Sequence, residues 1–350
     1  VGWRLQDVVD LIRGPKGSVV RLQILPEDSG TNGPAKITTL VRNRIKLEDQ
    51  AAKKSIIETN DGQAPARIGV IDIPAFYRDF DAASRGDEDF RSTTRDVRKI
   101  LREFIADKVD GVVIDLRQNG GGSLTEATEL TGLFIPSGPV VQVKDSAGSL
   151  EIEKDLDPEQ VYSGPLAVLV DRYSASASEI FAGAIQDYGR GIIIGEPTFG
   201  KGTVQTLIDL DRFVRNGGKK LGRLRLTMAQ FFRVNGGSTQ FRGVVPDIVY
   251  PTASDADDDG ERSLDNALPW ASISALKYAR SNLGSMDTYR DLHKLRVKSD
   301  LGFNYLVAER ESLRKIRKEK HITLNEEKRK KRWEERKQAK KERKNRFFES

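Results

Sequence analysis

Apolar residues recur along the first 250 residues in two patterns: short runs between turn residues, and longer stretches with three- and four-residue spacing. The short runs predict buried strands, at residues 67–74, 111–116, 140–143, 166–170 and 192–194. The wider spacing predicts helices, at residues 91–109, 125–134 and 174–186. Strands that alternate with helices are typical of a layered α/β fold.

The N-terminal region follows a different pattern. Residues 5–12 predict a short helix, and the alternation in 19–25 and 37–41 predicts a hairpin. These elements are too few for an independent core, so we expect residues 1–46 to be part of a domain. The polar residues 47–66 predict a linker.

After residue 201 the pattern returns to strand-like runs, at residues 204–210, 224–228, 230–234 and 244–250. Helical patterns follow, at residues 270–279, 289–295 and 305–313. We therefore expect a mixed α/β core over residues 67–250 and a helical C-terminal extension over residues 251–350.

Composition removes several kinds of chemistry. The 350 residues include no cysteine, which excludes thiol catalysis, cysteine-ligated zinc and disulfide bonds. The two histidines, His293 and His321, lie in the charged C-terminal third, and neither is at a strand end or a glycine turn. This argues against a Ser-His-Asp triad and against histidine-ligated zinc. We expect no metal and no cofactor.

The net charge of +6 is unevenly distributed. Seventeen Lys/Arg against six Asp/Glu between Arg314 and Arg346 give this segment +11, so the other residues together carry −5. Acids are interspersed with the bases throughout the segment, which is typical of a solvated or coiled helix. We therefore expect no nucleic-acid binding.

The stretch from Gly164 to Gln205 concentrates the candidate chemistry. Ser174, Ser176 and Ser178 begin a predicted helix after an apolar strand, and Lys201 lies between two glycines. A lysine with a neutral amine can activate a serine hydroxyl, and burial or nearby positive charge favours the neutral form. The pattern does not distinguish among the three serines.

A glycine loop could support such a pair. The residues Asn119-Gly120-Gly121-Gly122 follow the strand GVVIDL, and glycine lets a backbone N–H come close to a substrate. Backbone donors at this loop and in the first turn of the serine helix could stabilise an oxyanion.

A nucleotide-binding loop is the rival interpretation. Gly195-x4-Gly200-Lys201 follows a strand and nearly matches a P-loop. However, Gly202 stands where a magnesium-binding Ser or Thr is required, and the next residues are strand-like, so no helix N-terminus would meet the phosphates.

Several segments together resemble the C-terminal processing peptidases, in particular the long bacterial tail-specific proteases. These segments are RIGVIDIPAFY, GVVIDLRQNGGGSLTEA, SASASEIFAGAIQDYG, GEPTFGKGTVQ and RVNGGSTQFRGVVPDI, which cover roughly residues 67–250. The opening GWRLQDVVDLIRGPKGS is similar to the later half of the PDZ domain of such proteases. The resemblance implies a protease core of the Clp-protease and crotonase type, after a partial PDZ domain.

The resemblance also implies residue roles in a serine endopeptidase with a Ser–Lys dyad. Ser176 matches the nucleophile, Lys201 the general base, and Gln205 the residue that orients the lysine. Gly122 and Ala177 match the oxyanion donors. Glu179, Thr198 and Asp187 match supporting polar residues near the site, and Gly121 matches a supporting glycine.

Family substrates are proteins with apolar, unstructured C-termini, and some members pair with a helical-repeat lipoprotein adaptor. Gram-negative members work in the periplasm or at the periplasmic face of the inner membrane, which agrees with the lack of cysteine. The first PDZ strand and its carboxylate-binding loop are expected before Val1, so tail capture by this chain is in question. The alternative is a PDZ-type module that binds tails and cleaves nothing.

Overall fold

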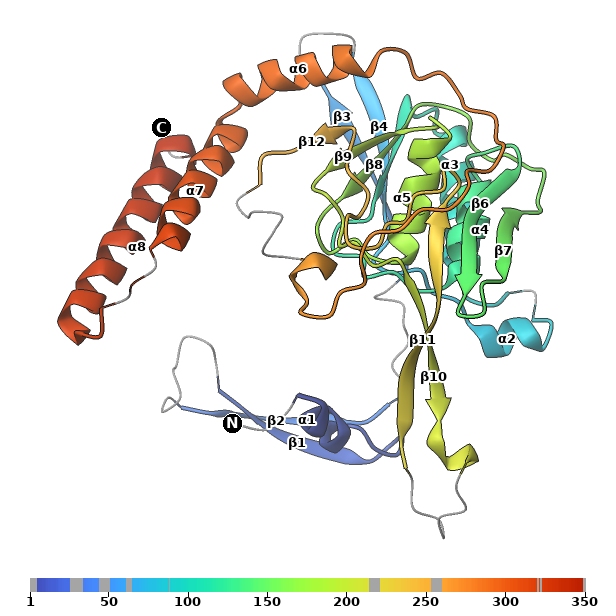
Figure 1. The fold of residues 1–350 in the computed structure, drawn as a ribbon. Coiled ribbons are helices and arrows are strands. Elements are labelled where there is room, and N and C mark those ends of the chain that lie inside the picture. Colours follow the sequence, from blue (N-terminus) through green and yellow to red (C-terminus); the bar gives the residue numbers. More distant parts are fainter. Residues whose placement is uncertain are drawn as a thin grey trace. The chain divides into compact units, whose positions relative to one another are not determined.

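The computed structural model of this protein describes residues 5–25, 34–43, 51–60, 65–87, 89–213, 221–252, 260–319, 321 and 323–348. The chain divides into two compact units, Val1–Asp49 and Gln50–Ser350 (Figure 1). The α-helices of the larger unit are α2 (Phe80–Ser84), α3 (Thr93–Ala106), α4 (Leu124–Gly132), α5 (Ala177–Asp187), α6 (Met286–Ser299), α7 (Leu301–Lys318) and α8 (Glu326–Phe348).

The smaller unit contains the predicted helix and hairpin. Helix α1 (Leu5–Ile12) precedes β1 (Val19–Ile24), which pairs antiparallel with β2 (Lys36–Val41). The Arg42 guanidinium donates to the carbonyls of Leu11 and Ile12, which satisfies acceptors that the end of a helix leaves free. Membership of this unit in a PDZ domain stays a prediction.

A six-stranded sheet forms the centre of the larger unit. Its order is β12 (Ile248–Val249), β9 (Ile192–Gly195), β8 (Leu166–Val170), β5 (Gly111–Asp115), β4 (Ala66–Asp72) and β3 (Lys53–Thr59). The strands from β12 to β4 run parallel, and β3 pairs antiparallel with β4. The linker predicted for residues 47–66 is therefore wrong for Lys53–Thr59. Lys53, Lys54 and Glu58 lie on this edge strand, where charged side chains can stay in contact with solvent.

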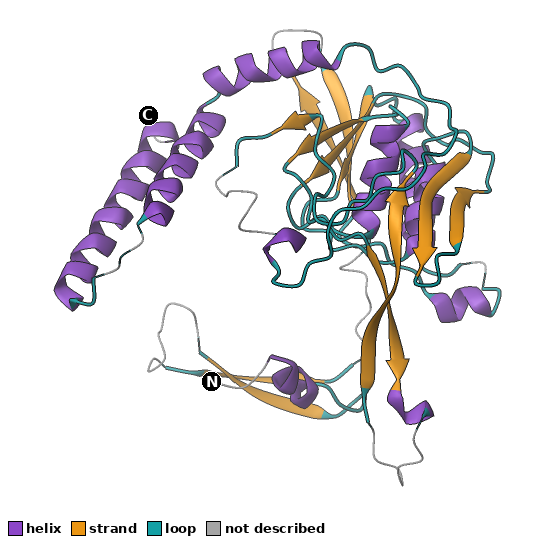
Figure 2. Ribbon diagram, in the orientation of Figure 1, coloured by secondary structure: helices purple, strands orange, loops and turns teal. Residues whose placement is uncertain are grey.

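Helices α3, α4 and α5 pack beside this sheet, as Figure 2 shows. Residues Val97, Leu101 and Phe104 of α3 are fully buried, as the helical spacing predicts. Ser92 caps α3 by accepting a hydrogen bond from the Arg95 N–H. Helix α5 is buried on almost every side, with Phe181 and Ile185 wholly inside the core. A helix covered in this way holds its N-terminal residues in a fixed place.

The second sheet is antiparallel. Its order is β10 (Thr203–Asp209), β11 (Arg223–Arg233), β6 (Gly138–Asp145) and β7 (Leu150–Asp155). The two strands predicted at 224–228 and 230–234 are one continuous strand, β11. The pattern did not predict β7, and the strand predicted at 244–250 is reduced to β12.

The C-terminal extension differs from prediction in its first part. The spacing predicts a helix over residues 270–279, but the structure has no helix there, and the backbone of this segment bonds to the core. The Ile273 and Leu276 N–H groups donate to the Gly236 and Val234 carbonyls, so tertiary hydrogen bonds replace the helical ones. The helices begin later, with α6 to α8. Within the described ranges, no helix combines the length and apolar character needed to cross a bilayer.

Candidate active site

Ser176 occupies a strained turn between β8 and α5. It is the N-cap of α5, and its backbone has φ 56° and ψ −111°. A positive φ is unfavourable for a residue with a Cβ and often marks a functional site. The turn leaves Ser176 partly exposed at the N-terminal end of a helix, where the helix dipole favours negative charge.

Burial distinguishes the three serines that the sequence left open. The Ser174 and Ser178 side chains are fully buried. Their hydroxyls donate to the backbone carbonyls of Leu116 (2.8 Å) and Asn119 (2.9 Å). Both hydroxyls therefore serve the packing of the turn, and only Ser176 is open to a substrate.

Glu179 connects the serine turn to the lysine loop. Its Oε2 accepts hydrogen bonds from the Ser176 N–H (2.8 Å) and the Lys201 N–H (2.9 Å). Its Oε1 accepts from the Thr198 hydroxyl (2.6 Å) and the Gly200 N–H (2.7 Å). A single carboxylate oxygen thus bridges the backbones of Ser176 and Lys201, 25 residues apart in the chain.

The environment of Glu179 is unusual for an acid. The side chain is completely buried, and among the described residues it forms no ion pair with a cation. Burial raises the pKa of Glu179 to about 7, although the four hydrogen bonds oppose this shift. The carboxyl group therefore gains or loses its proton near neutral pH. The ionised form accepts all four hydrogen bonds, whereas in the protonated form one oxygen carries a hydrogen and is a weaker acceptor.

The glycine loop lies against Ser176. A Cβ added to Gly121 would come within 2.9 Å of the Ser176 Cβ and 3.1 Å of the Ala177 nitrogen. At Gly122, which has φ 148°, it would come within 2.2 Å of the Phe76 carbonyl oxygen. In the described part of the chain, the Gly122 and Ala177 N–H groups donate to no protein carbonyl. Two candidate oxyanion donors thus remain, one on the residue after Ser176 and one on the residue after Gly121, whose backbone lies against Ser176.

Lys201 lies between Gly200 and the start of β10, partly exposed. In the described residues, no hydrogen bond joins its amine to the Ser176 hydroxyl or to Gln205. Gln205 is exposed on β10, just after a bulge in the pairing with β11. The structure therefore holds the backbone of Lys201 beside Ser176, with the two side chains not joined.

Two buried polar residues, Asn119 and Gln240, support the site through their side chains, a role that the sequence motifs do not indicate. The Asn119 amide donates to the Ile73 carbonyl and accepts from the Gly121 N–H, which holds the glycine loop. The side-chain Oε1 of Gln240 accepts a hydrogen bond from the N–H of Gly202, the residue directly after Lys201. Both residues lie in the glycine-rich motifs quoted above. A polar residue close to such glycines is the feature of the sequence that could have identified them.

Asp187 does not lie beside Ser176. It is the last residue of α5, so roughly 16 Å of helix separates it from the N-cap. Its carboxylate binds the Arg233 guanidinium through Nε at 3.0 Å and Asn235 Nδ2 at 2.8 Å. The supporting position expected for Asp187 near the serine is corrected to a buried ion pair at the other end of the helix.

The local structure at Lys201 also bears on the P-loop interpretation. The chain continues into β10, so a strand rather than a helix N-terminus follows the lysine. This arrangement lacks the N-terminal amides that would bind phosphates.

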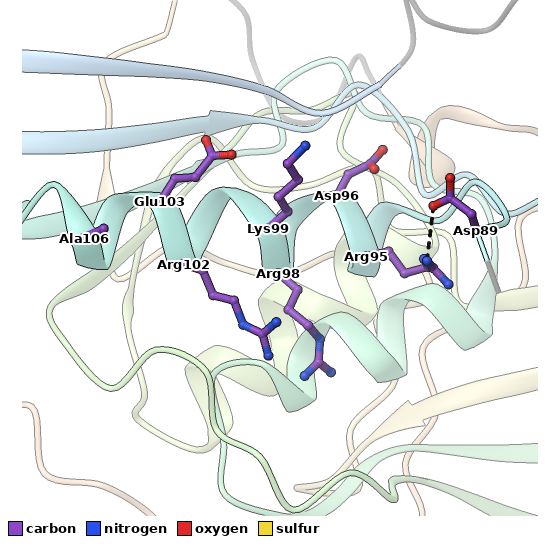
Figure 3. A pocket seen from close by; sticks show the side chains of 8 residues that line it. All are labelled: Asp89, Arg95, Asp96, Arg98, Lys99, Arg102, Glu103 and Ala106. Atoms are coloured by element: carbon purple, nitrogen blue, oxygen red, sulfur yellow. Dashed lines mark hydrogen bonds and ion pairs between the residues drawn. The ribbon is translucent and has the colours of Figure 1, made fainter.

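A surface hollow of about 760 Å³ lies elsewhere, along α3 (Figure 3). In Figure 3, Arg98 and Arg102 point to one side of α3, and Lys99 and Glu103 point to the other. Arg98 binds Asp157 and Glu159, and Arg95 binds Asp89. These exposed ion pairs are typical of a solvated helix face, and none of the residues lining the hollow belongs to the Ser176 site.

Comparison with known sequences gives two family matches. Peptidase family S41 matches residues 67–250, and the C-terminal domain of tail specific protease matches residues 254–350. The tail-specific protease of Haemophilus influenzae is 44% identical over 330 residues, which cover 93% of this chain and 45% of that protein. The carboxy-terminal-processing protease of Bartonella bacilliformis is 34% identical over 249 residues, covering 71% and 50%.

Among solved structures, a photosystem II D1 C-terminal processing protease matches with a TM-score of 0.49 and 27% identity, covering 71% of this chain and 59% of that one. The chain spans about half the length, or less, of the curated relatives it matches.

Proposed function

Because this chain belongs to peptidase family S41, we propose that it is a serine endopeptidase in which Ser176 is the nucleophile and Lys201 the general base. The observation that carries this proposal is the Glu179 carboxylate, which binds the backbone N–H of both residues. This carboxylate holds the two backbone N–H groups on one oxygen, and the proposal requires that the Lys201 and Ser176 side chains rotate to bring the amine to the hydroxyl. Catalytic hydrogen bonds commonly form only when substrate is bound.

The chemistry follows from these positions. The neutral Lys201 amine takes the Ser176 hydroxyl proton as Oγ attacks the scissile carbonyl carbon. The N–H groups of Gly122 and Ala177 stabilise the resulting oxyanion. The lysine then gives its proton to the departing amine, and an acyl-enzyme remains on Ser176. Water, activated by the same amine, hydrolyses the ester and restores the serine.

Gln205 and Thr198 take supporting roles in this proposal. Gln205 orients the Lys201 side chain once that side chain rotates toward the serine. Thr198 fixes Glu179, since its hydroxyl donates to Oε1 and accepts from the Val244 N–H at 2.7 Å. The site needs no metal or cofactor for this chemistry.

The proposed substrates are proteins with apolar, unstructured C-termini, and a helical-repeat lipoprotein adaptor is a proposed partner. The name of the H. influenzae relative and the match of residues 254–350 to the tail-specific protease C-terminal domain support this substrate class. We place the activity in the bacterial periplasm, because a chain without cysteine suits an oxidising compartment. Fractionation of cells that produce the full-length protein tests the location.

The test of the mechanism uses the full-length protein and an unfolded substrate protein with an apolar C-terminal tail. Ser176→Ala and Lys201→Ala should each lower turnover about a thousandfold or more, with unchanged circular dichroism. Ser178→Ala and Lys99→Ala are the matched controls, since the Ser178 hydroxyl only packs the turn beside Ser176 and Lys99 lies on α3, away from the site. Unchanged turnover in either site variant would reject the mechanism. A wild-type protein that binds tails but yields no fragments would be a binding module instead.

A further inference from the structure

In the described part of the larger unit, four strands form the edges of its two sheets, and three of them have features that prevent pairing with another chain. β7 (LEIEKD) carries four charged residues, β3 (KKSIIET) carries three, and β12 is only two residues long. Charged side chains and short length are the usual means by which proteins protect a sheet edge.

The fourth edge, β10, lacks this protection. Its sequence, TVQTLID, has no proline and a single charged residue, Asp209, at its far end. Leu207 is 57% exposed. A bulge lies at Val204/Gln205, but Thr206–Asp209 pair regularly with β11. In the described part of the chain, no strand pairs with the other side of β10. An unprotected edge of this kind can accept an added strand.

This edge leads directly into the candidate active site. β10 begins two residues after Lys201, and Glu179 bridges the Lys201 and Ser176 backbones. In Figure 1 the β10–β11 ribbon extends well past β6 and β7. Only residues 229–233 of β11 pair with β6, so the outer part of the ribbon is two-stranded. An extended polypeptide along β10 would thus run from this ribbon to the serine.

The two faces of the ribbon differ in chemistry. Directly paired residues share a face in an antiparallel sheet. Thr206 and Ile208 share one face with their partners Leu226 and Leu224, which are 42% and 48% exposed. The opposite face carries more polar residues, namely Gln205, Leu207 and Asp209 with their partners Thr227, Arg225 and Arg223. An added strand would therefore have every second side chain on this face, next to Thr206 and Ile208, with Leu226 and Leu224 one strand further along the same face.

We propose that the free edge of β10 binds the substrate polypeptide as an added strand, with apolar side chains at every second position next to Thr206 and Ile208, on the face that Leu224 and Leu226 extend. The inference rests on the proposed protease function and names the way in which that site takes its substrate. Main-chain hydrogen bonds provide sequence-tolerant affinity, and the apolar face provides a preference for alternating apolar residues.

The test is a backbone scan of a 12-residue fluorogenic peptide with one cleavage site and leucine at every second position. Single N-methyl groups are placed at each residue in turn, since N-methylation removes one donor and blocks strand pairing. The inference predicts kcat/KM losses of threefold to tenfold at alternate residues and little change between them. Binding of the same peptides to Ser176→Ala, followed by fluorescence anisotropy, should show the same two-residue period.

Two variants locate the effect on β10. Ile208→Asp should lower kcat/KM for the leucine peptide about tenfold and favour a peptide with lysine at those positions. Leu207→Asp, the matched control on the opposite face, should leave the leucine preference unchanged.

The outcomes separate this inference from the proposed function. If the peptide and an unfolded protein are cleaved without any two-residue period, the edge proposal fails and the protease stands. If nothing is cleaved, the protease proposal fails, and the anisotropy scan alone decides whether β10 binds an extended chain.

Discussion

Helix α5 has a buried carboxylate near each end, and the two are held in opposite ways. Near the N-terminal end, Glu179 accepts four hydrogen bonds from neutral donors and, among the described residues, forms no ion pair with a cation. At the C-terminal end, Asp187 forms an ion pair with Arg233, whose side chain is 15% exposed.

This difference indicates what each acid does. A carboxylate opposite a guanidinium has its charge compensated, and removing either partner leaves a buried charge. A carboxylate surrounded by N–H groups instead sets the positions of those groups, and its own charge depends on pH. Asp187 therefore contributes to stability, whereas Glu179 determines the geometry of the active site.

The largest expected effect comes from breaking the ion pair. Asp187→Ala leaves Arg233 buried without its acid and should lower the free energy of unfolding by about 3–5 kcal/mol. Urea unfolding measures this loss. Asp287→Ala is the control, because Asp287 forms an exposed pair with Arg290 and should lose less than about 0.5 kcal/mol. Equal losses in the two variants would show that the Asp187 pair is not effectively buried.

The second prediction concerns pH and Glu179. Its pKa of about 7 in the fold lies above the ordinary value of 4.5, so the folded state binds more protons than the unfolded state between these values. The contribution of Glu179 protonation to the free energy of unfolding is complete below about pH 4.5. It is lost as pH rises through 7, by roughly 3 kcal/mol in total.

Glu179→Gln removes this titration and serves as the reference. The unfolding free energy of the wild type relative to Glu179→Gln should fall by that amount between pH 4.5 and 8, as measured in urea at each pH. A difference that rises with pH would mean that the four donors keep the carboxylate charged, and the environment of Glu179 would then resemble that of Asp187.

The third prediction separates positioning from stability. In Glu179→Gln an NH₂ group replaces one oxygen and faces two of the four donors. One pair of donors, at Ser176 and Lys201 or at Thr198 and Gly200, then loses its acceptor, so the serine turn and the lysine loop are less firmly fixed, and kcat should fall about 30-fold, near 2 kcal/mol, with little change in KM. Glu126→Gln is the control, because Glu126 is equally buried, accepts from Ser92 and Thr94, and lies outside the site. Equal kcat losses in both would reduce Glu179 to a structural residue.

Some features at the two ends of α5 could be predicted from the sequence, and others could not. The strand–turn–helix around Ser176 and the glycine-flanked lysine follow from local patterns, and both are present. The choice among Ser174, Ser176 and Ser178 does not follow, because it depends on which hydroxyls the neighbouring Gly loop and strand ends bury. The predicted helix 174–186 already puts Asp187 at the end opposite Ser176, so the helical spacing argues against a place beside the serine, and only the motif match suggested one.

Charge and tertiary hydrogen bonds explain the other errors. Lys53–Thr59 was interpreted as a linker because an edge strand and a linker can have the same polar composition. Residues 270–279 have a helical apolar pattern, but the Ile273 and Leu276 N–H groups donate to the carbonyls of Gly236 and Val234, which follow β11. Neither outcome is encoded in the local spacing, because each depends on hydrogen bonds with another segment, β4 for Lys53–Thr59 and residues 234–236 for residues 270–279.

The smallest expected effect tests the distinction between the serines. Ser178→Ala removes a buried hydrogen bond to the Asn119 carbonyl, which also accepts from the Ala175 N–H at 3.0 Å. Because that carbonyl keeps a partner, the unfolding free energy should fall by only about 1 kcal/mol. The kcat should stay within threefold of wild type, since Ser178 only packs the turn. A loss of kcat comparable to that of Ser176→Ala would mean that the turn, rather than one hydroxyl, carries the activity at this end of α5.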